Sequence, residues 1–214
     1  MKLPAVVTAS ALLLSLAACS QRSDTVAHDL ATAPADAFMA AIAAHCGQAY
    51  AGKVVEDTPA PTGKDPFAGQ RLVMHVRGCA DPAHELRIPF HVGDDHSRTW
   101  VLIRTPNGLR LKHDHRHEDG SPDAITLYGG DSSPPGTAER QQFPADADSV
   151  AMFRRADMLA STHNTWAMEI DPDQTFVYEL TRPDGRRFRV QFDLSKPVDL
   201  PPPPWGDEAA QPAR

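Results

Sequence analysis

The chain has 214 residues, of which 41% are hydrophobic and 23% are charged, and its formal net charge at pH 7 is −7. An acidic surface disfavours binding to nucleic acid and adsorption to anionic lipid. Beyond the N-terminus the longest apolar run, residues 37–44, is eight residues long, whereas a bilayer span needs ~20. Any attachment to a membrane must therefore come from the N-terminus.

The N-terminus has the features of an export signal. Lys2 precedes an uncharged run of fourteen residues, 5–18, which is too short for a transmembrane helix. The run ends in Leu16-Ala17-Ala18-Cys19, which resembles the lipobox of bacterial lipoproteins. The resemblance implies cleavage before Cys19 and acylation of Cys19 by diacylglycerol and fatty acids such as palmitate. Because Ser20 rather than aspartate follows, it also implies the outer membrane, with the protein facing the periplasm. An ordinary secretory signal cut elsewhere and a chance apolar N-terminus are the alternatives.

These features predict a signal peptide at 1–18, a flexible tether at 19–35, a single β-domain at 36–205 and a disordered tail at 206–214. Lipidation of Cys19 would leave Cys46 and Cys79 as a pair in an oxidising compartment. We expect a disulfide between them, and two separate buried thiols are the alternative.

Hydrophobic periodicity predicts one helix, a loop and then mainly strands. Asp36 is positioned to cap a helix that runs to Tyr50, and residues 53–69 read as a loop. Alternation of apolar and polar residues predicts strands at 72–77, 85–92, 100–104, 109–117, 125–128, 137–143, 166–170, 176–181 and 187–194. A second, short helix is expected at 149–159.

Two proline- and glycine-containing turns, at 106–108 and 183–185, predict hairpins. In the first we expect Thr105 to pair with Leu109, and in the second Glu179 to face Arg189 in a surface ladder. Sequential antiparallel strands predict a mainly β fold: an up-and-down barrel or a two-sheet sandwich, with an N-terminal helix and one short internal helix. The barrel is similar in outline to the calycins, the lipocalin-like ligand-binding barrels.

The densest group of chemically versatile side chains is His113, His115 and His117, which share one face of a strand. Same-face neighbours are about 6.6 Å apart, so one ion can bind His113 and His115 but not all three imidazoles. The segment resembles the cupin metal-binding signature, with shorter spacings before His113 and before Glu118. The resulting candidate is a site for zinc or another divalent transition metal at His113, His115 and Glu118. A solvated strand end and an acid–base role are the alternatives.

No motif identifies a catalytic nucleophile or a phosphate-binding loop, and the catalytic residues, if any, are unknown from sequence. We expect an envelope protein that binds a small apolar or amphipathic ligand or a partner protein; a metal-dependent enzyme and a scaffold are the alternatives. Candidate ligand-binding residues are His91, Trp100, Trp166 and Glu169. The proline run 201–204 is interpreted as a strap over the barrel or as a ligand for a partner. The ending, 188–205, also resembles that of functionally unassigned exported proteins of proteobacteria.

Overall fold

The computed structural model describes residues 33–60, 62–63, 65–132 and 136–207. The expected signal peptide, Cys19, most of the tether and residues 208–214 lie outside this part of the chain. The elements are α1 (Pro34–Ala43), β1 (Ala49–Thr58), β2 (Leu72–His75), β3 (Glu85–Val92), β4 (Asp95–Thr105), β5 (Gly108–His115), β6 (Tyr128–Asp131), β7 (Arg140–Pro144), α2 (Ala147–Arg155), the 3₁₀ helix η1 (Leu159–His163), β8 (Thr165–Asp171), β9 (Thr175–Thr181) and β10 (Arg187–Val198). None of the helices in the described ranges is long and apolar enough to cross a membrane.

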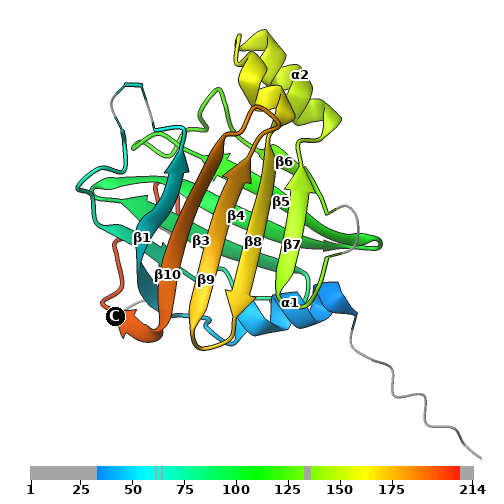
Figure 1. Ribbon diagram of the computed structural model, residues 1–214. Helices are drawn as coiled ribbons and strands as arrows, with labels where there is room; N and C mark the ends of the chain where they lie inside the picture. The colour runs from blue at the N-terminus through cyan, green and yellow to red at the C-terminus, as the bar shows by residue number, and fades with distance from the viewer. Residues whose placement is uncertain (1–32, 61, 64, 133–135, 208–214) are drawn as a thin grey trace, which may run out of the picture. The chain divides into compact units, whose positions relative to one another are not determined.

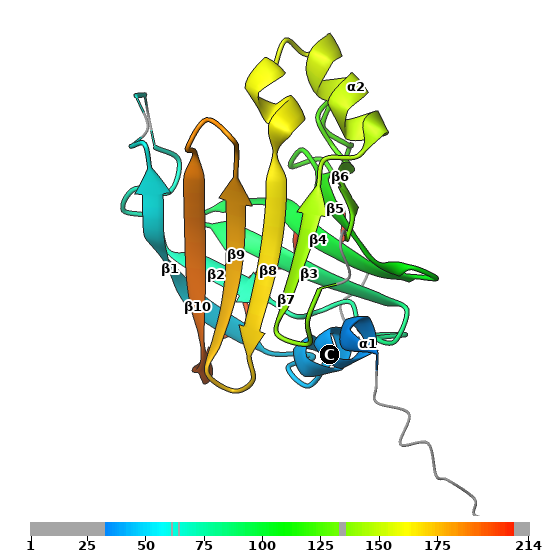
Figure 2. The same ribbon diagram turned by 45° about the vertical axis from the view of Figure 1, so that its right-hand side comes forward.

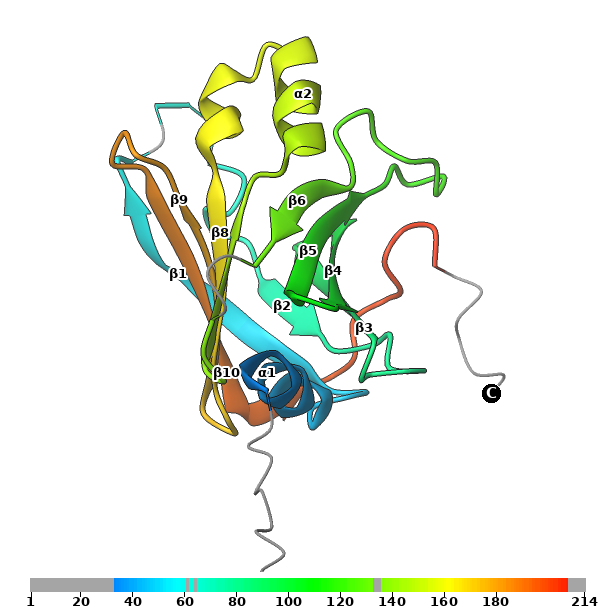
Figure 3. The same ribbon diagram turned by 90° about the vertical axis from the view of Figure 1, so that its right-hand side faces the viewer.

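The strands form one antiparallel ten-stranded sheet in the order β6-β5-β4-β3-β2-β1-β10-β9-β8-β7. Each strand therefore pairs with the next along the chain, except that β6 does not pair with β7, and β1 pairs with β10 instead. The sheet curls until its two edges approach each other, with β7 to β10 on one side and β3 to β6 on the other (Figures 1 and 3). The predicted up-and-down barrel is confirmed.

The barrel is nearly closed where β6 meets the end of β7. The backbone N–H of Asp146 donates to the carbonyl of Gly129 over 2.9 Å, and the Ser149 hydroxyl donates to the same carbonyl over 3.0 Å. A Cβ on Gly130 would lie 1.8 Å from the carbonyl oxygen of Pro144. Only a residue without a side chain permits this approach, so the two edges meet through backbone contacts.

The interior of the barrel is filled by the inward faces of the strands. Inward residues of β8 to β10 include Trp166, Met168, Phe176 and Phe192, all almost completely buried. The helix α1 lies across one end of the barrel, between the two sides of the sheet (Figures 2 and 3), and buries Phe38, Met39 and Ile42 in the same core. The interior is thus a packed core closed at the α1 end.

The start of the domain differs from the prediction in two respects. Asp36 does not cap the helix: the N-cap is Ala33, Pro34 occupies the first turn, and the Asp36 carboxylate pairs with Arg104 over 2.5 Å. The helix ends at Ala43, and the residues expected to form its last turn and the following loop include the long strand β1. Apolar and polar residues alternate poorly in the sequence of β1. The segment is nevertheless a strand because it is hydrogen-bonded to β2 on one side and to β10 on the other, and only the folded chain brings these neighbours together.

Cys46 and Cys79 form a disulfide with a Cα–Cα distance of 6.1 Å, as predicted. Cys46 lies in the turn after α1, and Cys79 lies between β2 and β3. The bond joins the end of the helix to the sheet across a sequence separation of 33 residues.

The hairpin of β4 and β5 has a different register from the one predicted. Thr105 pairs with Gly108 across a two-residue turn, so Trp100 lies opposite His113 and Val101 opposite Lys112. The expected pairing of Thr105 with Leu109 is wrong because Gly108 belongs to the strand instead of the turn. Since a one-residue shift changes which residues are neighbours across the pair, Trp100 and His113 now point into the barrel together.

Strand positions after β5 are predicted less well than those at the end of the chain. The strand expected at 125–128 begins only at Tyr128, and the helix expected at 149–159 is Ala147–Arg155, capped by the Asp146 side chain through Ser149 N–H at 2.8 Å. By contrast, β8, β9 and β10 lie where the alternation predicts them. Arg189 pairs with Glu179 in the expected register.

Candidate functional site

A pocket of about 180 Å³ lies inside the barrel, at the end away from α1. Its lining comes from β3, β4, β5, β6, β9, the start of β10, the loop before β2 and the turn between β9 and β10, which lies at the top of Figure 1. The lining residues are mainly aromatic: Phe67, Phe90, Arg98, Thr99, Trp100, His113, His115, Tyr128, Tyr178, Leu180, Arg186 and Phe188. We call this the barrel pocket.

Stacked rings form the walls of the barrel pocket. The Trp100 ring stacks on Phe90 at 4.9 Å and on Tyr178 at 4.6 Å between centroids, and Phe67 lies 4.8 Å from Phe188. Rings held on both sides have few rotamers available. The pocket therefore presents flat apolar surfaces that are fixed before anything binds.

The histidine and tyrosine side chains of the pocket wall are paired with one another. His113 is 3% exposed, and its Nδ1–H must donate to the carbonyl of Tyr128 at 3.1 Å, since a carbonyl only accepts. Its Nε2 then accepts from the Tyr178 hydroxyl at 2.9 Å. Burial lowers the pKa of His113 to about 3, and burial also raises the pKa of Tyr178. Both groups are neutral at physiological pH.

The predicted metal candidates are placed in three different environments. His113 uses both ring nitrogens in hydrogen bonds, His115 Nε2 lies 3.0 Å from the Tyr128 hydroxyl, and Glu118 is exposed in the turn after β5. Among the residues that the structure describes, no group of three or more histidines, cysteines or acidic residues is arranged to hold a metal ion. A metal at His113 would have to displace its existing partners.

The four predicted ligand-binding residues do not converge. Trp100 lines the barrel pocket, and Trp166 lies deeper in the core, 4.9 Å from the His113 ring. His91 and Glu169 lie on the outer face of the sheet, because their neighbours in sequence fill the core. The structure thus brings the two tryptophans toward one site and separates them from the other two residues.

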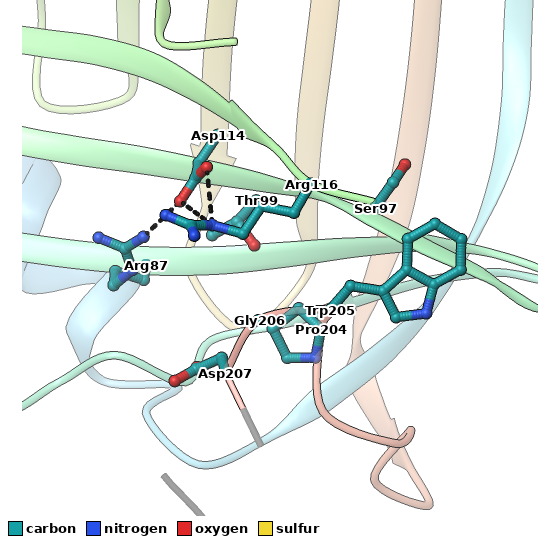
Figure 4. Close-up of a pocket in the computed structure, with 9 residues that line it drawn as sticks. All are labelled: Arg87, Ser97, Thr99, Asp114, Arg116, Pro204, Trp205, Gly206 and Asp207. Carbon is teal, nitrogen blue, oxygen red and sulfur yellow. Dashed lines mark hydrogen bonds and ion pairs between the residues drawn. The ribbon is translucent and has the colours of Figure 1, made fainter. Parts of the chain in front are cut away.

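A second, polar pocket of about 140 Å³ lies on the outside of the barrel, under the C-terminal segment (Figure 4). Asp114 accepts from Arg87 at 2.9 Å and from Arg116 at 3.2 Å, and Trp205 lines the pocket from the C-terminal segment. The segment is fixed by the Trp205 N–H, which donates to the carbonyl of His96 at 3.1 Å, and by an ion pair between Arg77 and Asp207 at 3.1 Å. The described chain therefore continues to residue 207, although the tail was expected to begin at residue 206. This arrangement fits the interpretation of the proline run as a strap.

Two buried histidines lie on this outer face. His91, 2% exposed, has no hydrogen-bond partner for either ring nitrogen among the described residues, and His75 has none for Nδ1. Burial, reinforced by nearby cationic groups, lowers the pKa of His91 to about 3 and that of His75 to about 4. Neutral imidazoles are therefore held here at physiological pH.

The ladder predicted on the last hairpin is more deeply buried than a surface ladder. The Glu179 side chain is 2% exposed and accepts from Arg140 at 2.6 Å, from Arg187 at 2.8 Å and from Arg189 at 2.5 Å. Burial alone raises the pKa of Glu179, but the three guanidinium groups outweigh it and lower the pKa to about 2. Glu169 belongs to the same network through Arg140 and Arg189. The Glu169 carboxylate therefore forms ion pairs within this network and is not free to bind a ligand.

Sequence reasoning missed most of the barrel pocket. Arg98 and Tyr178 have the inward position that alternation from Trp100 and Phe176 gives them, and this signal was available. Phe67 and Arg186 come from loops and turns, for which alternation gives no information.

Comparisons with known proteins give no independent guide to this site. No family model, no curated protein and no solved structure matches the chain. The function must therefore be argued from the pocket itself.

Proposed function

We propose that this protein is a lipid-anchored envelope protein that binds a small amphipathic ligand in the barrel pocket. The observation that carries the proposal is the barrel pocket: a fixed aromatic pocket, open at one end, in an otherwise tightly packed barrel. Small-molecule sites are typically concave and apolar, with a few placed polar groups, and the barrel pocket has this composition.

The size of the pocket limits the ligand. Its volume of about 180 Å³ is close to the roughly 150 Å³ of an engineered apolar cavity that binds benzene. A single ring with a short substituent fits this space, whereas a long acyl chain or a polypeptide segment does not. The proposal therefore favours a small molecule over a partner protein.

The proposed anchor and the pocket are compatible. The anchor would be the lipid on Cys19, placed on the periplasmic face of the outer membrane by the lipobox resemblance. The helix α1, which follows this N-terminal region in the sequence, lies at the bottom of the barrel in Figure 1, whereas the turn between β9 and β10, which contributes Arg186 to the pocket, lies at the top. The described chain therefore begins at the end of the barrel opposite the pocket.

Thermal denaturation in the presence of single-ring compounds tests the proposal. We expect such compounds to raise the Tm of the wild type, and Leu180→Trp, which fills the pocket, to abolish the effect. Val55→Trp, at a position on β1 that is 43% exposed, is the matched control and should respond like the wild type. The proposal fails if no single-ring compound raises the wild-type Tm or if Leu180→Trp responds equally.

A further inference from the structure

The barrel pocket has a charge asymmetry that its aromatic lining does not explain. Two arginines, Arg98 and Arg186, line it, and none of the described residues in the lining is an aspartate or a glutamate. The chain as a whole carries a formal net charge of −7, so a pocket with cationic side chains alone departs from the overall composition. This local charge selects among ligands that fit the aromatic walls.

Arg98 is held so that part of its guanidinium group remains available. It lies two residues before Trp100 on β4, opposite His115. Its Nη1 donates to the Asp95 carboxylate at 2.7 Å, while Nε and Nη2 have no acceptor among the described residues. The side chain is 23% exposed, so these donors are partly withdrawn from water. A second acceptor placed in the pocket would satisfy them.

Arg186 supplies a second cation at the rim. Its Nη1 is engaged by the Asp57 carboxylate and by the carbonyls of Thr58 and Pro59, both at 3.3 Å. The guanidinium carbon lies 5.7 Å from the centre of the Phe188 ring, which also lines the pocket. This arginine is thus fixed over an aromatic wall and contributes positive potential at the opening.

The remaining titratable groups of the pocket add no opposing charge. His113 and Tyr178 are paired with each other, and His115 is paired with the Tyr128 hydroxyl at 3.0 Å. Burial lowers the pKa of His115 and raises the pKa of Tyr128, so both are neutral at physiological pH. An anion in the pocket would meet neutral hydrogen-bonding groups and the two arginines, each of which is paired with one carboxylate outside the lining, Asp95 and Asp57.

We propose that the ligand of the barrel pocket is a small organic acid with one ring or a short apolar body, whose carboxylate binds Arg98. This inference rests on the proposed function and specifies its ligand class. The carboxylate would accept hydrogen bonds from Nε and Nη2 of Arg98, the side-on geometry for which guanidinium is suited. The apolar body would lie against Trp100 and Phe90. The positive potential of Arg186 at the rim would favour entry of anions over neutral compounds.

The test compares two ligands of the same size and shape, 3-phenylpropionate and its neutral isostere 3-phenylpropanamide. Dissociation constants are measured at pH 7.5 by ligand-observed NMR, with the anchored protein in detergent. We expect the acid to bind the wild type at least ~10-fold more tightly than the amide, since charged hydrogen bonds are about twice as strong as neutral ones. In Arg98→Met we expect this ratio to fall to about 1, with the affinity for the amide unchanged, which also shows that the variant is folded.

Arg110→Met is the matched control, because Arg110 is a half-exposed arginine paired with Asp131 outside the pocket. It should retain the wild-type preference for the acid. If Arg98→Met binds neither compound, Arg98→Gln provides a second neutral variant. Equal binding of acid and amide by the wild type, or an unchanged ratio in a folded Arg98 variant, overturns the inference while the proposed function stands. Failure of every single-ring compound to bind the wild type overturns both.

Discussion

Replacing Glu179 by glutamine tests whether the buried ion network on the outer face of β8 to β10 stabilises the barrel. The side chain is 2% exposed and is contacted by three arginines, Arg140, Arg187 and Arg189. Glutamine keeps the shape but removes the charge, which leaves three neighbouring guanidinium groups without their shared partner. The barrel should therefore be destabilised without a change of fold.

The size of the effect follows from the pKa of Glu179, which is lowered from 4.5 to about 2. At about 1.4 kcal/mol per pH unit, this difference contributes roughly 3 kcal/mol to the free energy of unfolding at neutral pH. Because the pKa is lower in the folded state, the contribution is complete above about pH 4.5. It is lost as the pH falls from 4.5 toward 2.

Urea denaturation followed by tryptophan fluorescence measures this contribution. We expect Glu179→Gln to lower the free energy of unfolding at pH 7 by about 2–3 kcal/mol, and the difference from wild type to shrink below pH 4.5. Glu56→Gln is the control, since Glu56 pairs with Arg187 from a position that is 37% exposed and should change stability by less than about 1 kcal/mol. A loss below about 0.5 kcal/mol for Glu179→Gln, or a difference that does not depend on pH, would refute the argument.

Three further predictions concern the disulfide, the buried histidines and the anchor. Replacing both Cys46 and Cys79 by serine should lower the free energy of unfolding by roughly 3–4 kcal/mol, because the bond closes a loop of about 34 residues in the unfolded chain; an unchanged urea midpoint would contradict this. The pKa of His91 is lowered from 6.5 to about 3, so as the pH falls the unfolded state is protonated at this residue before the folded state. Stability should therefore fall by about 2.5 kcal/mol between pH 7 and pH 4.5 through this residue alone. His91→Phe should reduce this pH dependence, whereas His84→Gln, at an exposed histidine, should not; equal pH profiles for wild type and His91→Phe would count against the prediction. Cys19→Ser should move the protein from the membrane fraction to the soluble fraction, and continued membrane fractionation would exclude lipid on Cys19 as the anchor.

The parts of the fold that the sequence predicts are those controlled by local chemistry. Alternation in β8, β9 and β10, with Asp184-Gly185 in the last turn, predicts both the strands and the pairing of Arg189 with Glu179. The disulfide was expected from an even pair of cysteines in a chain that we interpret as exported, and the structure contains it. These inferences need only neighbours in sequence, or a count of one residue type, and they are confirmed.

The parts that the sequence misses depend on partners distant in the chain. β1 is a strand because β10, more than 130 residues later, pairs with it and completes the barrel. The interpretation of Glu179 as part of an exposed ladder failed because Arg140, which covers it from β7, is about 40 residues away. Alternation in the sequence predicts only the face of the sheet on which Glu179 lies. Its burial depends on side chains that other strands place over it in the folded sheet.

The candidate site, like the fold, could be predicted from the sequence only in part. From the sequence by itself we predicted that His113 and His115 share one face of a strand and that Trp100 belongs to a ligand site, and we found no nucleophile motif. The export signal stays a prediction. Only the tertiary structure decided that Trp100 and His113 lie opposite each other, because the register of β4 and β5 depends on a turn one residue shorter than expected. It also decided that the pocket exists at all, since its walls come from six strands, a loop and a turn, and its volume is the space that their side chains leave unfilled.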